Sequence, residues 1–320
     1  MKTFRRSMRA ATFALAATAA GCVDYTIDTT IRADGSGTRV ERMEVTRNSD
    51  LDLTAETFQA LTGARPSDGW SSRTRVDTDG DTTWIVERTA TIDAWAGWVR
   101  PSGTALLKGA PPDRADERVG LVRLGDVVYR DSLAVTRAPG EGGGEVVTYR
   151  EWFVWHDAAA AVVEALVEQA RRDLRERYPA LSDEDRGTIL GYFRGRLWAA
   201  GEAGAFSDPD ADALIDDAVA RTAAHAARVM GEPAREPGLR ALFSAVVDVG
   251  SPEAEATFEG LLPGLTLGFN TSMVVRVTLP GTIVDTNADE REGNTLEWRF
   301  SPFDDLARPI ELRARAVVGG

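Results

Sequence analysis

The sequence predicts an α+β fold in which both ends of the chain build a mostly antiparallel sheet, with an all-helical block inserted between them. Apolar and polar residues alternate near both ends of the chain, and this period of two is typical of half-buried strands. In the middle, residues 157–262 carry apolar residues at helical spacing. Short polar turns separate many of the predicted strands, which favours antiparallel pairing.

The β-rich N-terminal part, residues 22–156, begins with a hairpin over residues 23–46. Alternating residues from Tyr25 to Ile31 lead into the turn Asp34-Gly35-Ser36-Gly37, where glycine tolerates positive φ, and Val40 to Val45 returns as the second strand. The other elements predicted here are a short helix over 50–62, a hairpin over 72–77 and 82–92, a loop over 100–118 and a strand over 119–129.

The last strand of this part, from Glu145 to Trp155, is apolar on both faces. Tyr149, Phe153 and Trp155 share one face, and Trp152 lies on the other. A strand that is apolar on both faces should be covered on both. Because the pattern becomes helical at His156, we expect the helical block to supply that second cover.

The helical block, residues 157–262, is predicted to contain four helices and a short fifth one. Pro179 ends the first helix, and Ser182 followed by Asp185 resembles a capping box that opens the second. Asp208-Pro209 indicates the start of the third helix, and Pro237 indicates the start of the fourth. The short fifth helix is predicted over residues 252–262.

Three glycines in the second predicted helix, Gly187, Gly191 and Gly195, follow one another at four-residue spacing. Each glycine costs a helix about 0.8–1 kcal/mol relative to alanine, so we expect a compensating close contact with another helix. A contact within the domain and a contact between two copies of the chain both satisfy this expectation, and we favour the first.

The C-terminal part, residues 263–320, returns to alternating patterns and is predicted to be an antiparallel meander that completes the sheet. Its predicted strands place these residues on shared faces: Met273, Val275, Val277 and Leu279; Leu296, Trp298 and Phe300; Ile310, Leu312, Ala314 and Ala316.

Residues 1–21 are predicted to be a signal peptide, since four basic residues precede a short apolar run from Ala10 to Ala20. Cys22 follows this run and is the only cysteine in the chain, so it cannot form a disulfide within it. The sequence leaves open an ordinary signal peptide that is cut near Ala20 and leaves Cys22 as a free thiol.

A lone cysteine at this place resembles the lipobox of bacterial lipoproteins. The resemblance implies that Cys22 carries a diacylglyceryl group and a further acyl chain such as palmitate, and that it anchors the protein to a membrane of the cell envelope. In a cell with two membranes, Val23 in place of an aspartate favours the outer one.

Both ends of the chain also resemble LppM-type bacterial lipoproteins. The similar residues are Asp34, Gly35, Gly37, Leu279, Pro280, Gly281, Asn287, Gly293, Asn294, Trp298 and Phe300. The resemblance implies an α+β domain outside the cytoplasmic membrane that binds a lipid or glycolipid. It implies no catalytic residue and does not include the helical block.

Composition narrows the function classes. The chain has a net charge of −13, and loss of the four basic residues of the signal lowers it to −17, which argues against nucleic acid as a partner. Neither His156 nor His225 has a second histidine or a cysteine at metal-binding spacing, so we expect no metal site and no cofactor. The usual sequence motifs of hydrolases and nucleotide-binding enzymes do not occur.

We therefore expect a non-enzymatic, membrane-anchored envelope lipoprotein that binds an apolar or lipid ligand between the sheet and the helices. Four tryptophans are the candidates for lining that ligand site: Trp95, Trp98, Trp152 and Trp155. A plain core role for these tryptophans is the simpler alternative. Two other functions stay open, namely docking of an unknown protein partner through the acidic helical block and hydrolysis by a pair of carboxylates.

Overall fold

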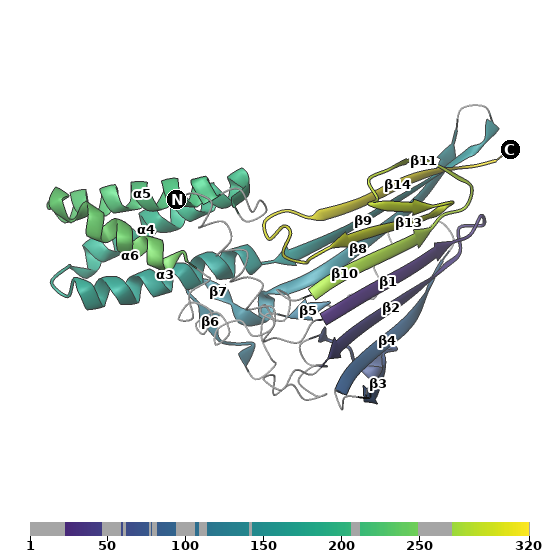
Figure 1. Cartoon of the computed structure of the whole chain (residues 1–320), viewed down its shortest axis with the longest axis horizontal. Coiled ribbons are helices and arrows are strands. Elements are labelled where there is room, and N and C mark those ends of the chain that lie inside the picture. Colours follow the sequence, from purple (N-terminus) through teal and green to yellow (C-terminus); the bar gives the residue numbers. More distant parts are fainter. Residues whose placement is uncertain are drawn as a thin grey trace.

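Two β-sheets pack face to face, and a helical block extends from one end of them, in the computed structural model of the chain (Figure 1). The structure describes residues 23–46, 62–76, 82–93, 106–108, 114–140, 143–205, 212–248 and 271–319, with the single residues 59 and 78. The predicted α+β class is confirmed, although its strands form two packed sheets where the sequence predicts one.

The larger sheet, sheet A, is built from both ends of the chain and has the strand order β12-β13-β10-β1-β2-β4-β3. Strand β1 joins the two ends, because it pairs antiparallel with β2 and parallel with β10. The strands of sheet A are β1 (Val23–Ile31), β2 (Gly37–Thr46), β3 (Ser71–Val76), β4 (Thr82–Ile92), β10 (Thr271–Thr278), β12 (Glu290–Glu292) and β13 (Thr295–Phe300).

The smaller sheet, sheet B, has the order β11-β14-β9-β8-β5. Its strands are β5 (Leu107–Lys108), β8 (Val128–Pro139), β9 (Glu145–His156), β11 (Thr282–Thr286) and β14 (Ile310–Val318). The predicted C-terminal meander is therefore wrong: β10 and β13 belong to sheet A, whereas β11 and β14 belong to sheet B. The alternating pattern predicts which face of a strand is buried, but it does not predict which neighbour the strand pairs with.

The predicted strand over 119–129 is also wrong. This segment forms a small hairpin of β6 (Arg118–Val119) and β7 (Val122–Arg123) and then a 3₁₀ turn, and β8 begins only at Val128. Gly120 sits in the hairpin turn with a φ of 56°. The short strand β5 falls within the loop predicted over 100–118, and β6 begins at the last residue of that loop. The helix predicted over 50–62 lies almost entirely, and the fifth helix over 252–262 entirely, outside the described residues.

The space between the sheets has an aromatic half and a charged half. Where β9 faces β13, Tyr149 stacks on Trp298 with ring centroids 6.3 Å apart, and Phe153 meets Phe300 at 5.2 Å. Such ring pairs stabilise a core beyond the apolar area they bury. Where β8 and β9 face β2 and β4, the interior is filled by buried charged side chains instead.

The helical block consists of α3 (Ala158–Arg177), α4 (Asp183–Ala200), α5 (Asp212–Val229) and α6 (Glu236–Val246). Successive helices pack against one another, and α6 also contacts α3. The predicted cap of α4 is present, since the backbone N–H of Asp185 donates to Ser182 Oγ at 3.0 Å. Phe193 and Phe243 meet in the centre of the block with centroids 4.9 Å apart.

The described helices of the block, α3 to α6, do not cover the outer face of sheet B, so for the part of the chain that the structure describes that prediction is wrong. Helix α3 continues from the end of β9 after Asp157, and the block extends beyond the ends of the strands (Figure 1). Its buried Glu164 accepts two hydrogen bonds from Arg194 of α4, at 2.5 and 3.0 Å, and lies directly against Gly120 of the β6–β7 hairpin.

The glycine series on α4 has no close neighbour. A Cβ atom placed on Gly187, Gly191 or Gly195 would meet no heavy atom of the described residues within 4 Å outside its own helix turn. The predicted contact between two helices of the block is therefore wrong for the part of the chain that the structure describes.

Alanine substitution should have opposite effects on stability at Gly191 of α4 and at Gly120 of the β6–β7 turn. Gly191→Ala should raise the free energy of unfolding by about 0.5–1 kcal/mol, because it adds helix propensity without a clash. Gly120→Ala should lower it by more than about 1 kcal/mol, because the new Cβ would overlap Glu164 and the φ is positive. Urea denaturation measures both, and a destabilised Gly191→Ala would contradict the open surface found here.

Candidate functional site

Five charged side chains meet between the two sheets and are between 0 and 3% exposed. We call this group the buried ion cluster: Arg39 and Glu41 of β2, Arg88 of β4, Asp131 of β8 and Glu151 of β9.

Arg39 is the centre of the buried ion cluster. Its Nη2 lies 2.5 Å from Asp131 Oδ2 and 2.7 Å from Glu151 Oε1, so one guanidinium binds two strands of the opposite sheet. Its Nε donates to Glu41 Oε1 at 2.8 Å, and the other oxygen of Glu41 accepts from Arg88 at 2.7 Å. Charge-assisted bonds of this kind are stronger than neutral hydrogen bonds.

Two tyrosines and a threonine complete the hydrogen bonding. Tyr149 donates its hydroxyl to Glu151, and Tyr25 donates to Glu41 Oε2 at 3.3 Å. Arg39 Nη1 donates to Thr29 Oγ1 at 3.2 Å. Burial raises the pKa of Tyr149 well above its ordinary value, so the phenol stays protonated and remains a donor.

Strand alternation places these residues. On β2, Arg39 and Glu41 share the inner face with Met43 and Val45. On β9, Glu151 sits between Tyr149 and Phe153 on the face that points to sheet A. A carboxylate in the middle of an apolar face requires a buried cation, so Glu151 was the signal in the sequence that could have revealed the cluster.

The cluster has three carboxyl groups for two guanidinium groups. Burial raises the pKa of Asp131 to about 8; Arg39 opposes this shift, and the nearby Glu151 and Glu41 add to it. At neutral pH, Asp131 is therefore mainly protonated, which balances the charge of the cluster. The carboxyl pair resembles a general acid and base, yet no substrate can reach it while the two sheets stay packed.

Asp131→Asn should make stability less dependent on pH. The Asp131 carboxyl ionises near pH 4 in the unfolded chain and near pH 8 in the folded one, so unfolding releases its proton between these values. Its contribution to stability is therefore complete below pH 4 and falls as the pH rises towards 8, by at most about 1.4 kcal/mol per pH unit.

Urea unfolding between pH 5 and pH 8 measures this effect. The loss of stability over that range should be smaller in Asp131→Asn than in the unaltered protein. Asp126→Asn is the matched control: Arg123 lowers the pKa of this exposed carboxyl, so it stays ionised throughout the range and its replacement should leave the pH dependence unchanged. Equal pH dependence in Asp131→Asn and the unaltered protein would contradict the raised pKa.

The outer face of sheet B carries a second group of charges, which we call the arginine surface. Four exposed arginines point outward from three adjacent strands: Arg130 of β8, Arg150 of β9, and Arg313 and Arg315 of β14. Arg150 lies 3.9 Å from Glu311, an ion pair between exposed side chains. No described residue forms an ion pair with Arg130, Arg313 or Arg315.

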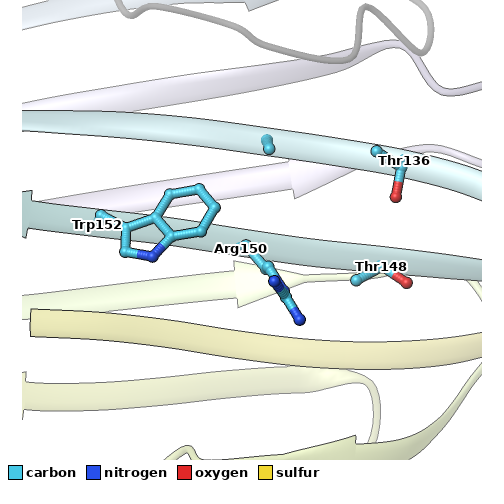
Figure 2. A pocket seen from close by; sticks show the side chains of 5 residues that line it. Thr136, Thr148, Arg150 and Trp152 are labelled. Atoms are coloured by element: carbon cyan, nitrogen blue, oxygen red, sulfur yellow. The ribbon is translucent and has the colours of Figure 1, made fainter.

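A shallow hollow of about 260 Å³ adjoins the arginine surface. Figure 2 shows Trp152 and Arg150 of β9 on the same side of the sheet as Thr148 and Thr136, and Ala134 completes the lining. The hollow is open to solvent, which suits contact with another surface better than enclosure of a small ligand.

Of the four tryptophans predicted to line a ligand site, the two that the structure describes do not come together. Trp152 and Trp155 lie on opposite faces of sheet B and cannot line one cavity. Trp155 is 5% exposed, donates to the carbonyl of Pro302 at 2.9 Å and packs against Tyr129 and Phe303, so it is part of the core. Trp95 and Trp98 lie outside the described residues.

The other predicted features are placed as follows. Cys22 lies outside the described residues, and β1 begins at the next residue, Val23. His225 stacks on Tyr192 with centroids 4.1 Å apart, and His156 is exposed. Over the described part of the chain, no group of side chains could hold a metal ion, and no helix is both long and apolar enough to cross a membrane.

Several of the residues that resemble LppM-type lipoproteins stabilise turns or connect neighbouring strands. Asp34 accepts hydrogen bonds from the backbone and side chain of Ser36. Asn287 connects the two sheets: it accepts from Trp298 Nε1 of sheet A at 3.0 Å and from the backbone N–H of Arg313 of sheet B at 2.8 Å. Asn294 donates to the carbonyl of Leu279 at 2.6 Å. These roles are structural.

Comparison with known proteins gives few matches. No protein-family model and no curated protein matches this chain. Among solved structures, the NMR structure of the folded domain of LppM from Mycobacterium tuberculosis aligns with 94% of this chain and 93% of its own, at 9% sequence identity and a TM-score of 0.28. At that TM-score, the likeness supports no argument about this chain, and the proposals below rest on its own residues.

Proposed function

We propose that this chain is a lipid-anchored envelope protein that docks an acidic protein partner through its arginine surface and performs no chemistry itself. The arrangement that carries this proposal is the set of outward arginines around Trp152 on an otherwise acidic protein.

The anchor is supported by the first 22 residues. A basic start, a short apolar run and a lone cysteine directly before the first strand form the pattern of an exported, acylated protein. Acylation also accounts for Cys22 in an exported protein, where a free exposed thiol is a liability. We therefore propose attachment to an envelope membrane through Cys22.

The docking role is supported by a like-charge pair in sheet B. Arg150 of β9 and Arg313 of β14 are direct cross-strand partners, and both side chains are exposed on the outer face. Like charges directly opposite each other destabilise a sheet. An acidic partner would relieve this repulsion and would be attracted to an arginine surface on a chain of opposite overall charge.

The chemistry of the surface fits a protein partner. Arginine and tryptophan are the residue types that most often dominate binding energy at protein interfaces. Trp152 supplies an apolar contact beside the charges, and Thr136 and Thr148 supply neutral hydrogen-bonding groups (Figure 2).

The two other candidate functions have less support. A lipid ligand between sheet and helices would need an apolar cavity beside Trp155, and the described residues pack that space with Tyr129 and Phe303. A carboxylate-based hydrolase would need access to Asp131 and Glu151, which are sealed between the sheets. We therefore propose a non-enzymatic role.

Charge reversal tests the docking role, with poly-L-glutamate as an acidic probe. Arg150→Glu combined with Arg313→Glu should weaken binding at least about tenfold at low salt, because the attraction becomes repulsion. The matched control reverses Arg73 and Arg299, two exposed arginines of sheet A, and gives the same change in net charge.

Fluorescence anisotropy of a labelled probe measures the affinity. The control pair should weaken binding less than about threefold, and raising the salt concentration should weaken binding to the unaltered protein. Equal losses in the two double variants would contradict the proposal, because they would show that net charge matters and the arginine surface does not.

A further inference from the structure

We propose that a hollow between the β6–β7 hairpin and α3 binds a small phosphomonoester, at a site separate from the arginine surface. We call it the hairpin hollow. It has a volume of about 450 Å³ and is lined by Arg118, Val119, Gly120, Glu168 and Arg172, all of them described residues. Sites for small molecules have volumes of about 300–1,000 Å³, so the hairpin hollow has room for a small organic phosphate.

The turn of the β6–β7 hairpin is fixed against α3. Helix α3 contacts both strands of the hairpin, which lies beside it (Figure 1). Gly120 in the turn lies so close to Glu164 that a Cβ atom there would overlap the carboxylate, and Arg194 holds Glu164 with two hydrogen bonds. Both walls of the hairpin hollow are therefore in place before a ligand binds, which lowers the entropic cost of binding.

The two arginines of the hairpin hollow are available to an anion. Arg172 donates to the neutral side-chain oxygen of Gln169 at 2.6 Å, and Arg118 makes a long contact of 3.5 Å with the carbonyl of Leu121. Neither arginine forms an ion pair with another described residue. Arg172 lies eight residues, or about 12 Å of helix, beyond Glu164, so it is distant from the carboxylate at the fixed turn.

Two carboxylates near these arginines already have cationic partners. Arg171 Nε lies 3.2 Å from Glu168 Oε1, and Arg123 Nη2 lies 2.8 Å from Asp126 Oδ1. The hydrogen bond from Arg123 lowers the pKa of Asp126, and Arg118 adds a smaller effect. The lining of the hairpin hollow thus has two positive charges and one negative charge that is already paired, on a chain with a net charge of −13.

This arrangement matches the chemistry of a phosphomonoester. A guanidinium group binds phosphate oxygens through two parallel N–H donors, and the charge of a phosphomonoester at pH 7, about −1.5 to −2, suits two such groups. Glu168 lines the same hollow and would accept a hydrogen bond from a hydroxyl group of the ligand. Glycerol 3-phosphate carries both kinds of group and is the probe for this site.

Isothermal titration calorimetry with glycerol 3-phosphate tests the site in the full-length protein. Arg118→Gln combined with Arg172→Gln should weaken binding at least about tenfold, because the two changes remove the charge-assisted hydrogen bonds to the phosphate. Glycerol, which lacks the phosphate, should give no measurable binding. An affinity for glycerol equal to that for glycerol 3-phosphate would overturn the proposal.

The matched control combines Arg73→Gln with Arg299→Gln, two exposed arginines of sheet A, and gives the same change in net charge. Its affinity for glycerol 3-phosphate should stay within about twofold of the unaltered protein, because the hairpin hollow is untouched. Equal losses in the two double variants would overturn the proposal, as would the absence of binding to the unaltered protein up to millimolar concentrations.

Hydrogen exchange places the ligand. In saturating glycerol 3-phosphate, the backbone amides of residues 118–123 should exchange more slowly, because a ligand held by both walls stabilises the hairpin. Slower exchange confined to the strands of sheet B would overturn the site.

Binding of poly-L-glutamate separates this proposal from the docking role. The variant with Arg118→Gln and Arg172→Gln should keep its affinity for that probe within about threefold, because the arginine surface is intact. A tenfold loss would show that the hairpin hollow is not a separate site and would overturn it.

Vesicles distinguish a free phosphomonoester from a lipid head group of the same chemistry. Phosphatidic acid presents a glycerol phosphomonoester, and the Cys22→Ala variant carries no acyl chain of its own. Flotation of this variant with phosphatidylcholine vesicles containing phosphatidic acid, if lost with Arg118→Gln and Arg172→Gln, would support the site with a lipid as its ligand. Binding of glycerol 3-phosphate without flotation would support a free ligand, and binding of neither would overturn the site.

Discussion

The ion pairs of Arg39 are the interaction on which the rest of the sandwich depends. One guanidinium in β2 reaches Asp131 in β8 and Glu151 in β9, so it fixes the lateral position of one sheet over the other. Apolar side chains tolerate some sliding, but a buried charge must keep its partners in hydrogen-bonding geometry. The buried ion cluster therefore favours one arrangement of the two sheets over the others.

The two-sheet arrangement places charged side chains in two different environments, one between the sheets and one on the outer face of sheet B. Carboxylates and guanidinium groups inside the sandwich neutralise one another, with Asp131 mainly protonated at neutral pH. On the outer face of sheet B, Arg150 and Arg313 stand opposite each other, and Arg313 has no ion pair among the described residues. The charges of the cluster are thus sealed between the sheets, and the arginines that we propose bind a partner are on the outside.

The sequence predicts the strands and helices better than it predicts their neighbours. The alternation of apolar and polar residues correctly predicts the buried faces of β1, β10, β13 and β14. Pro179 and Ser182 correctly predict the boundary between α3 and α4. It cannot divide the C-terminal strands between two sheets, because pairing depends on long-range contacts that leave no local pattern.

The candidate site was harder to predict for a related reason. The sequence indicates that Trp152 and Trp155 lie on opposite faces of β9, but it does not indicate that the helices leave the outer face open. On β2, charged residues occupy both faces, so alternation alone does not show that Arg39 and Glu41 are buried. The glycine series of α4 was misleading, because a spacing that suits close helix contact lies on an open surface here.

The free energy of unfolding of Arg39→Met tests the central role of the cluster most directly. Removing the cation while its carboxylates stay buried should cost about 3–5 kcal/mol, and adding Asp131→Asn and Glu151→Gln should recover part of that loss by removing the unpaired charges. A loss below about 1 kcal/mol, as expected for an exposed ion pair, would contradict the claim that Arg39 holds the two sheets in register.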